Sequence, residues 1–74
     1  MEYEFDRDAV SERLREELGK LGLRQSELAE KFGCNRRVIS GYFKGVNIPN
    51  AYYLSVIHRC GCDIIYILTG ERRA

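Results

Sequence analysis

The sequence predicts an all-α protein built from five short helices. Apolar residues recur at the three- and four-residue spacing that lines one face of a helix. Glycines divide the chain into stretches of helix length, and Asn or Asp stands before several of them, where an N-cap residue is favoured. No segment clearly predicts a strand, because the β-branched run 64–67 lies between a cap residue and a glycine that both favour a helix.

The first helix is expected between Asp6 and Gly19. Within that stretch Val10, Leu14 and Leu18 recur at every fourth residue, which stacks them on one helix face. Asp6 suits the positive end of the helix dipole at the N-terminus, and the segment that begins at Gly19 ends the helix.

Four more helices follow, each closed by a glycine. They are expected at about 25–32, 35–44, 50–61 and 63–70. Asn35, Asn50 and Asp63 are the expected N-cap residues of the last three. Gly33 and Gly45 stand where the chain must turn after the second and third helices. The side chains expected to point inward from these four helices are Leu28, Ala29, Phe32, Leu54, Ile57, Ile64, Ile67 and Leu68.

Length and composition predict one soluble globular domain, residues 1–74. Hydrophobic residues make up 45% of the chain and charged residues 31%, a balance that disordered chains lack. No apolar run approaches the ~20 residues that span a bilayer, so no membrane contact is expected. The N-terminus lacks the basic and apolar regions of a secretory signal, and the protein is therefore expected in the cytoplasm.

Neither metal chemistry nor catalysis is expected. Cys34, Cys60 and Cys62 are an odd, sparse set, which predicts free thiols in a reducing compartment. His58, Cys60 and Cys62 alternate, but positions two apart lie ~200° apart on a helix and would not converge on a zinc ion. The chain has one His, no carboxylate pair in an apolar setting and no glycine-rich phosphate loop. We therefore expect no cofactor, no metal, no small-molecule substrate and no enzyme.

Charge is distributed unevenly along the chain. The net charge is only +1, but residues 1–20 carry seven acids and four bases, whereas residues 21–48 carry five bases and two acids. Residues 35–44 hold three bases and no acid. A local basic face of this kind can bind a polyanion even when the whole chain is close to neutral.

Residues 25–44 carry the most informative pattern. Two helices that cross closely need a small side chain at the crossing, which Ala29 supplies, and a turn residue that tolerates positive φ, which Gly33 supplies. The buried apolar anchors of the pair are expected to be Leu28, Ile39 and Tyr42. This pattern resembles the helix-turn-helix of the Cro and CI family of phage repressors.

The resemblance extends over roughly residues 10 to 70. Residues 49–70 are similar to the closing helices of phage CI-type repressor domains, which commonly end in Tyr-x-Leu-Thr-Gly, as residues 66–70 do here. The resemblance implies a compact five-helix bundle of the lambda-repressor-like DNA-binding type. Two departures stand out. Arg24 replaces the usual Ser or Thr, which weakens the cap and offers a phosphate contact instead, and Cys34 replaces the usual Val with another small hydrophobe.

The expected third helix has one polar face. At ~100° per residue, Arg36, Arg37 and Lys44 fall on one arc with two small residues, and the apolar residues fall on the opposite arc. A helix that enters the major groove needs this arrangement, and the first-turn arginines would pair with guanine O6 and N7. By the resemblance, the base-reading residues are Asn35, Arg36, Arg37, Ser40 and Gly41. The expected phosphate-binding residues are Arg24, Gln25, Lys44 and Asn47.

Two functions remain open from the sequence. The resemblance implies sequence-specific binding of a double-stranded DNA operator by a homodimer that acts as a transcriptional repressor or regulator of phage or prophage type. Apolar residues of the last two helices, Tyr52, Tyr53, Ile64 and Ile65, are the expected dimer interface. The alternative is a helix-turn-helix scaffold reused as a protein interaction module of antirepressor or antitoxin-like kind, for which the acidic first helix leaves room. The acid-free segment 35–44 favours DNA.

Overall fold

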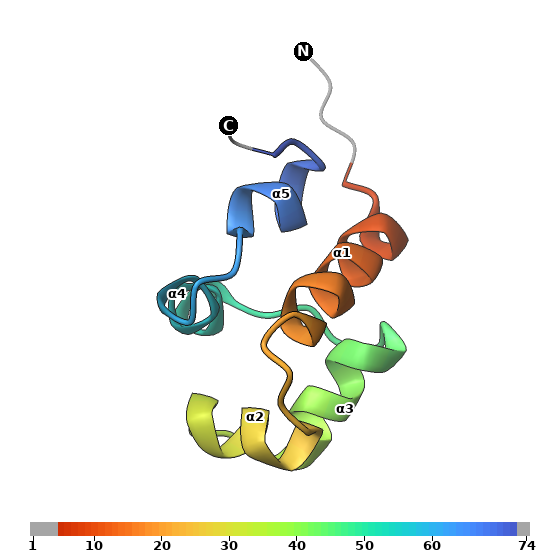
Figure 1. The fold of residues 1–74 in the computed structure, drawn as a ribbon. Helices are drawn as coiled ribbons and strands as arrows, with labels where there is room; N and C mark the ends of the chain where they lie inside the picture. Colours follow the sequence, from red (N-terminus) through yellow and green to blue (C-terminus); the bar gives the residue numbers. More distant parts are fainter. Residues whose placement is uncertain (1–4, 73–74) are drawn as a thin grey trace.

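The computed structural model describes residues 5–72 and shows five helices in that range (Figure 1). They are α1 (Arg7–Gly19), α2 (Gln25–Phe32), α3 (Arg36–Lys44), α4 (Ala51–Arg59) and α5 (Ile64–Thr69). The all-α prediction is confirmed, and the ambiguous run 64–67 is helical. The expected ends of the domain, residues 1 and 74, lie outside the described range.

Each helix except α2 begins at an Asn or Asp whose side-chain oxygen accepts a backbone N–H. The four cap residues and their oxygen-to-nitrogen distances are Asp6 (3.1 Å), Asn35 (2.8 Å), Asn50 (3.0 Å) and Asp63 (2.9 Å). The predicted caps at residues 35, 50 and 63 are therefore confirmed. These bonds satisfy backbone donors that have no partner inside the helix, which fixes where each helix starts.

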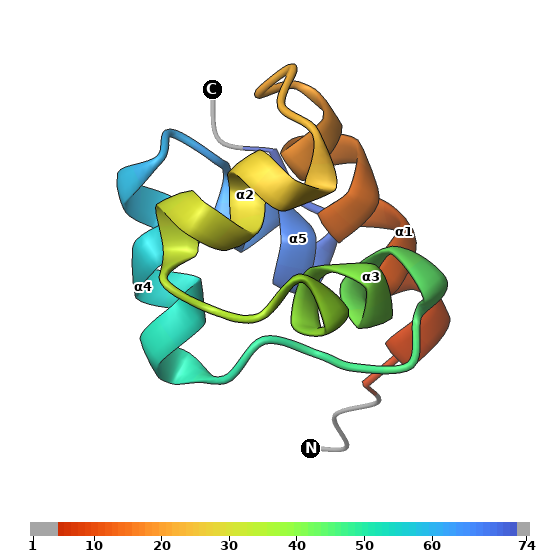
Figure 2. The ribbon, with the colours of Figure 1, turned by 90° about the horizontal axis from the view of Figure 1, so that it is seen from below.

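The five helices pack against one another in a single bundle. α1 packs against α3 and α5, while α2 packs on α3, and α4 contacts α2 and α5. In Figure 1, α2 and α3 lie together at the lower end of the molecule, away from both chain ends. Seen from below in Figure 2, α2 and α3 lie nearest the viewer and are joined by a short turn. The pair is thus presented at one surface, with the rest of the bundle behind it.

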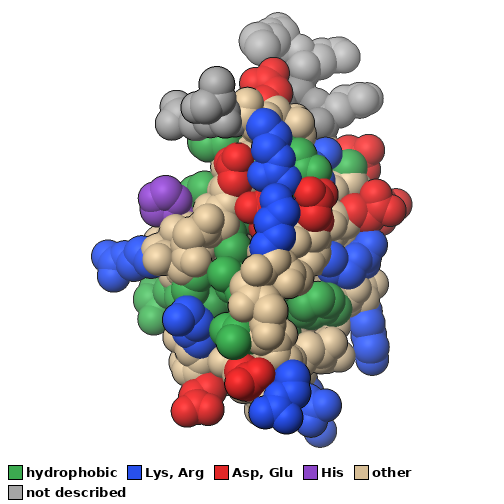
Figure 3. All heavy atoms as spheres, in the orientation of Figure 1, with side chains coloured by type: hydrophobic (Ala, Val, Ile, Leu, Met, Phe, Trp, Pro, Cys, Tyr) green, Lys and Arg blue, Asp and Glu red, His purple; other side chains and the backbone are tan. Residues whose placement is uncertain are grey.

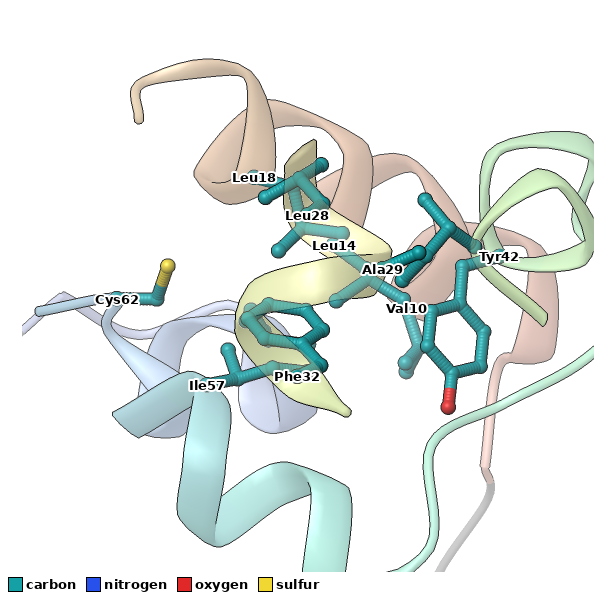
Figure 4. Packing of buried hydrophobic residues seen from close by; sticks show 11 residues of the cluster. Val10, Leu14, Leu18, Leu28, Ala29, Phe32, Tyr42, Ile57 and Cys62 are labelled. Carbon is teal, nitrogen blue, oxygen red and sulfur yellow. The ribbon is translucent and has the colours of Figure 1, made fainter. Parts of the chain in front are cut away.

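The core draws on all five helices (Figure 4). Its buried apolar residues are Val10, Leu14, Leu18, Leu28, Ala29, Phe32, Ile39, Tyr42, Ile57, Cys62 and Ile67. The predicted stripe on α1 and the predicted anchors of the α2–α3 pair are all among them. Leu54, Ile64 and Leu68, also expected to point inward, are only half-buried, and of these three Ile64 packs against the core.

Two arginines of α1 donate hydrogen bonds to carbonyl groups near the C-terminal ends of α3 and α5. The Arg15 guanidinium donates to the Phe43 carbonyl at 2.8 Å, in the last turn of α3. Arg13 donates to the Ile67 carbonyl at 3.0 Å, near the end of α5. The C-terminal carbonyls of a helix lack partners inside it and carry the negative end of its dipole, so both contacts are favourable.

Glu17 is the buried acid of α1, with 4% of the residue exposed. Its carboxylate accepts from the Lys20 ammonium at 2.8 Å, from the Asp63 N–H at 2.8 Å and from Arg72 at 3.0 Å. Burial alone raises the pKa of Glu17, but these hydrogen bonds outweigh it and lower the pKa to about 2. The carboxylate thereby ties α1 to the start of α5 and to the chain that follows α5.

Candidate nucleic-acid interface

The turn between α2 and α3 has the predicted geometry. Gly33 adopts the left-handed conformation with φ +69°, and the Cys34 N–H donates to the Ala29 carbonyl at 3.0 Å, which closes α2. Ala29 is 5% exposed and belongs to the buried core. Asn35 then caps α3. The glycine turn and the burial of Ala29 are therefore confirmed, while the place of Ala29 at the crossing of the two helices stays a prediction.

α3 turns its first-turn arginines outward. Arg36 and Arg37 are exposed, Ser40 is half-buried, and Ile39 and Tyr42 are buried. The predicted phase of the helix is confirmed for these five residues. Their roles toward bases stay a prediction, because exposure alone does not identify a ligand.

Asn35 has a structural task that limits what else it can do. Its side-chain oxygen accepts the Arg37 N–H at 2.8 Å. An Asn carboxamide has one oxygen acceptor and an NH₂ group with two donors. The NH₂ group and the second lone pair of that oxygen are therefore the parts of Asn35 left for a base edge.

Gly41 differs from expectation, because it is buried rather than open on the polar face. The side chain of Asn47, which follows α3 by three residues, lies against it. A methyl group added at Gly41 would overlap the Asn47 Nδ2 atom and lie 3.0 Å from its Cγ atom. The glycine thus has a packing reason that helical phase alone does not reveal, and a base contact by Gly41 itself stays a prediction.

The expected phosphate-binding residues occupy different settings. The Arg24 side chain is 84% exposed, and its Nε atom donates to Glu27 at 3.2 Å. The same Glu27 carboxylate accepts the backbone N–H of Arg24 at 2.9 Å, which is one of the two bonds of a capping box. The other bond is missing, because the Arg24 side chain has no acceptor atom. Gln25 opens α2 and is half-buried, while Lys44 is exposed beside a cleft of about 310 Å³ that Asp8 and Glu12 also line. Lys44 therefore stands in a more acidic setting than the arginines of α3.

The bases of α3 are not engaged by acids of the chain. Among residues 5–72, ion pairs within 4 Å involve only the bases Lys20, Arg24 and Arg72. Arg36 and Arg37 make none with a described residue. Figure 3 shows basic side chains projecting from the lower end of the molecule, where α2 and α3 lie, with acidic ones beside them. Of the two helices, α3 carries three bases and no acid, whereas α2 carries one base and two acids, so the positive charge of the pair lies in α3.

The cysteines do not form a metal centre in the part of the chain that is described. No group of three or more His, Cys, Asp or Glu side chains comes together there. Burial is the main reason that the pKa of Cys62 rises to about 11, and burial also raises the pKa of Cys34, so both thiols stay protonated at neutral pH. No helix of residues 5–72 is long and apolar enough to cross a membrane.

The α2–α3 pair has a glycine turn, a buried small residue on α2 and exposed arginines on α3. These features define a helix-turn-helix protein of the lambda-repressor-like fold. The sequence model of the family described as Helix-turn-helix matches residues 13–59, more than half of the chain, and the protein belongs to that family. The matched stretch contains all of α2, α3 and α4. The protein is accordingly a DNA-binding regulator in the general sense. Comparison with curated proteins found no match, and comparison with solved structures found none either.

Sequence reasoning missed the polar contacts that hold the domain together. Glu17 was not singled out, although it follows Val10 by seven residues and so shares the apolar face of α1 at ~100° per residue. That position was the available signal for a buried acid. No comparable signal marked its partner Arg72, or the contact of Asn47 with Gly41, because both join segments through tertiary structure.

Proposed function

We propose that this protein is a sequence-specific repressor of phage or prophage type that binds a double-stranded DNA operator, with α3 in the major groove. The proposal rests on one observation above all. Arg36 and Arg37 are exposed in the first turn of α3 and have no ion-pair partner among residues 5–72. In a chain of net charge +1, two adjacent unpaired cations on the second helix of a helix-turn-helix favour an external polyanion.

The proposed roles divide between reading and positioning. Arg36 and Arg37 would each contact guanine O6 and N7 as a bidentate pair, with Ser40 and the Asn35 amide at neighbouring base edges. Gln25 at the start of α2 would donate to a phosphate together with the free N–H groups of that helix end. Arg24 and Lys44 would add charged phosphate contacts, and Asn47 would add an uncharged one. Residues 1–74 would act as one domain.

Binding isotherms of four variants test the proposal. Arg36→Ala and Arg37→Ala should each cost ~1–3 kcal/mol on the selected operator and relax base preference at defined positions. Arg24→Ala should weaken binding to operator and scrambled duplexes about equally, with a salt slope lower by about one. Arg59→Ala is the matched control, because Arg59 is an exposed base at the end of α4, outside the α2–α3 pair.

The outcome separates the two functions that the sequence left open. Full operator affinity and selectivity in both the Arg36 and Arg37 variants would mean that α3 is not the reader, and an interaction module would then be the better description. If Arg59→Ala weakened operator binding as much as Arg36→Ala does, the binding would be explained by general charge attraction and not by base recognition through α3.

We also propose that two copies bind one operator through α4 and α5. Tyr52 of α4 is 65% exposed and Ile65 of α5 is 38% exposed, which leaves two large apolar side chains in water. A symmetric dimer would cover them and would match a palindromic site with half-sites about one helical turn apart. Sedimentation on a palindromic duplex should give two proteins per site. One protein per site, unchanged by Tyr52→Ser, would refute this arrangement.

A further inference from the structure

Gly41 and Asn47 form a contact that neither residue's expected role explains. Gly41 lies one turn after Arg37 on α3, so the two positions share a stripe of the helix surface. At Gly41 that stripe carries no side chain of its own, and the Asn47 carboxamide lies where a Cβ atom would be. The polar group that continues the arginine stripe is therefore supplied by the loop after α3.

The loop is held in place from two sides. The Gly41 carbonyl accepts the Val46 N–H at 2.9 Å and the Asn47 N–H at 3.2 Å, so the backbone of Asn47 is fixed to the same residue as its side chain. The Arg7 guanidinium of α1 donates to the Val46 carbonyl. Both the backbone and the side chain of Asn47 therefore have a fixed position against Gly41, although Asn47 lies in a loop.

The Asn47 carboxamide remains available for a ligand. The residue is exposed, and no hydrogen bond between residues 5–72 uses its side chain. Its two donors and its acceptor can reach oxygen or nitrogen atoms outside the chain. A pre-positioned amide next to an arginine stripe loses less conformational entropy on binding than one on a free loop.

We propose that Gly41 is a positioning residue for Asn47: the absence of a side chain at Gly41 lets the carboxamide lie against α3 for the DNA contact that the sequence already predicts for Asn47. This inference rests on the proposed function and deepens it. The DNA atom is a phosphate oxygen or a base edge, since a carboxamide donates to both. Glycine is required at position 41 because any side chain there displaces the amide from the helix surface.

A double-mutant cycle tests the proposal. Asn47→Ala should weaken operator binding about five- to tenfold, the range for one lost hydrogen bond. Gly41→Ala should cause a similar loss, because its methyl group displaces the amide into the open cleft of about 400 Å³ that Asn47 borders. The double variant should bind no more weakly than either single variant. Gly19→Ala is the matched control, since a Cβ atom at Gly19 meets nothing within 4 Å.

Two further measurements make the result specific. An NMR cross-peak between the Gly41 α-protons and the Asn47 side-chain amide protons, recorded without DNA, should be present in the natural protein. Urea unfolding should show Gly41→Ala to be at least as stable as the natural protein, because alanine favours the helix interior. Loss of binding then reports the moved amide and not loss of fold. Comparison of operator with scrambled duplexes distinguishes a base contact, which affects selectivity, from a phosphate contact, which does not.

The outcomes that overturn the inference differ from those that overturn the proposed function. Additive losses in the double variant, or full operator affinity in Gly41→Ala while Asn47→Ala is weakened, would show that the glycine does not position the amide. Full affinity in both single variants while Arg36→Ala is weakened would remove Asn47 from the interface and leave the proposed function intact. Absence of DNA binding by the natural protein would refute the proposed function itself.

Discussion

Replacing Glu17 by Gln removes a buried charge while it keeps the shape of the side chain. The amide oxygen of Gln can still accept the Asp63 N–H, but the charged contacts to Lys20 and Arg72 become ordinary hydrogen bonds. We expect Glu17→Gln to destabilise the domain at neutral pH. We also expect the size of that effect to depend on pH, because only the ionised form of Glu17 makes the stronger contacts.

The magnitude follows from the pKa of Glu17, which is about 2 in the folded protein in place of the ordinary 4.5. Each unit of that difference is worth ~1.4 kcal/mol, so the ionised carboxylate contributes up to about 3 kcal/mol at pH 7. The Lys20 and Arg72 side chains are 54% and 42% exposed. Solvent screening of these partners lowers the expected loss to the range of ~1–3 kcal/mol.

The sign of the pH dependence is set by the lowered pKa. The contribution is fully present above pH 4.5, declines as the pH falls, and is lost below the folded-state pKa of about 2. Urea unfolding followed by circular dichroism should therefore give a difference between the natural protein and Glu17→Gln that is less than half as large at pH 3 as at pH 7. Glu12→Gln, an exposed position on the same helix, is the control and should change little at either pH. A Glu17→Gln effect that is equal at both pH values would contradict this reasoning.

Two other substitutions test the turn and the contact between α2 and α3. Gly33→Ala places an L-residue at φ +69° with no neighbour within 4 Å of the new Cβ atom, so thermal unfolding should show a purely backbone cost of ~1–2 kcal/mol. An unchanged melting temperature would mean that the turn can relax. Ala29→Leu overpacks a site that is 5% exposed and should cost ~1–3 kcal/mol in urea unfolding. The sequence pattern predicts Ala29 at the crossing of α2 and α3, so the larger side chain should also displace α3 and weaken DNA binding. Retention of both stability and binding would show that the site tolerates bulk.

The helices were predictable because local chemistry determines where they begin and end. Asn35, Asn50 and Asp63 cap their helices through bonds to residues two or three positions ahead, and Gly33 supplies a left-handed turn. These effects act within one turn of chain, so a single sequence contains them. The depth of burial was less predictable, because it depends on how α4 packs: Ile57 is fully buried, while Leu54, one turn earlier, is only half-buried.

The candidate site was predictable where helical phase decides it. Arg36 and Arg37 lie outward because Ile39 and Tyr42 must lie inward. Phase did not predict that Gly41 is covered, because Asn47 reaches it from a loop whose path depends on tertiary contacts. A helical wheel treats a helix as isolated, and it fails at a position that another segment covers.

Several basic residues outside the α2–α3 pair serve the fold, which has a measurable consequence for DNA binding. Arg13 and Arg15 of α1 donate to backbone carbonyls, and Lys20 holds Glu17, so these bases serve the fold. On the proposed DNA face, only Arg24 and Lys44 would neutralise phosphates, while the arginines of α3 read bases. Each neutralised phosphate contributes about −0.9 to the slope of log K against log[salt], so a slope of roughly −2 per protomer is expected. A slope steeper than about −5 per protomer would place additional bases, such as Lys31, on the phosphates and would require a larger contact surface than the α2–α3 pair provides.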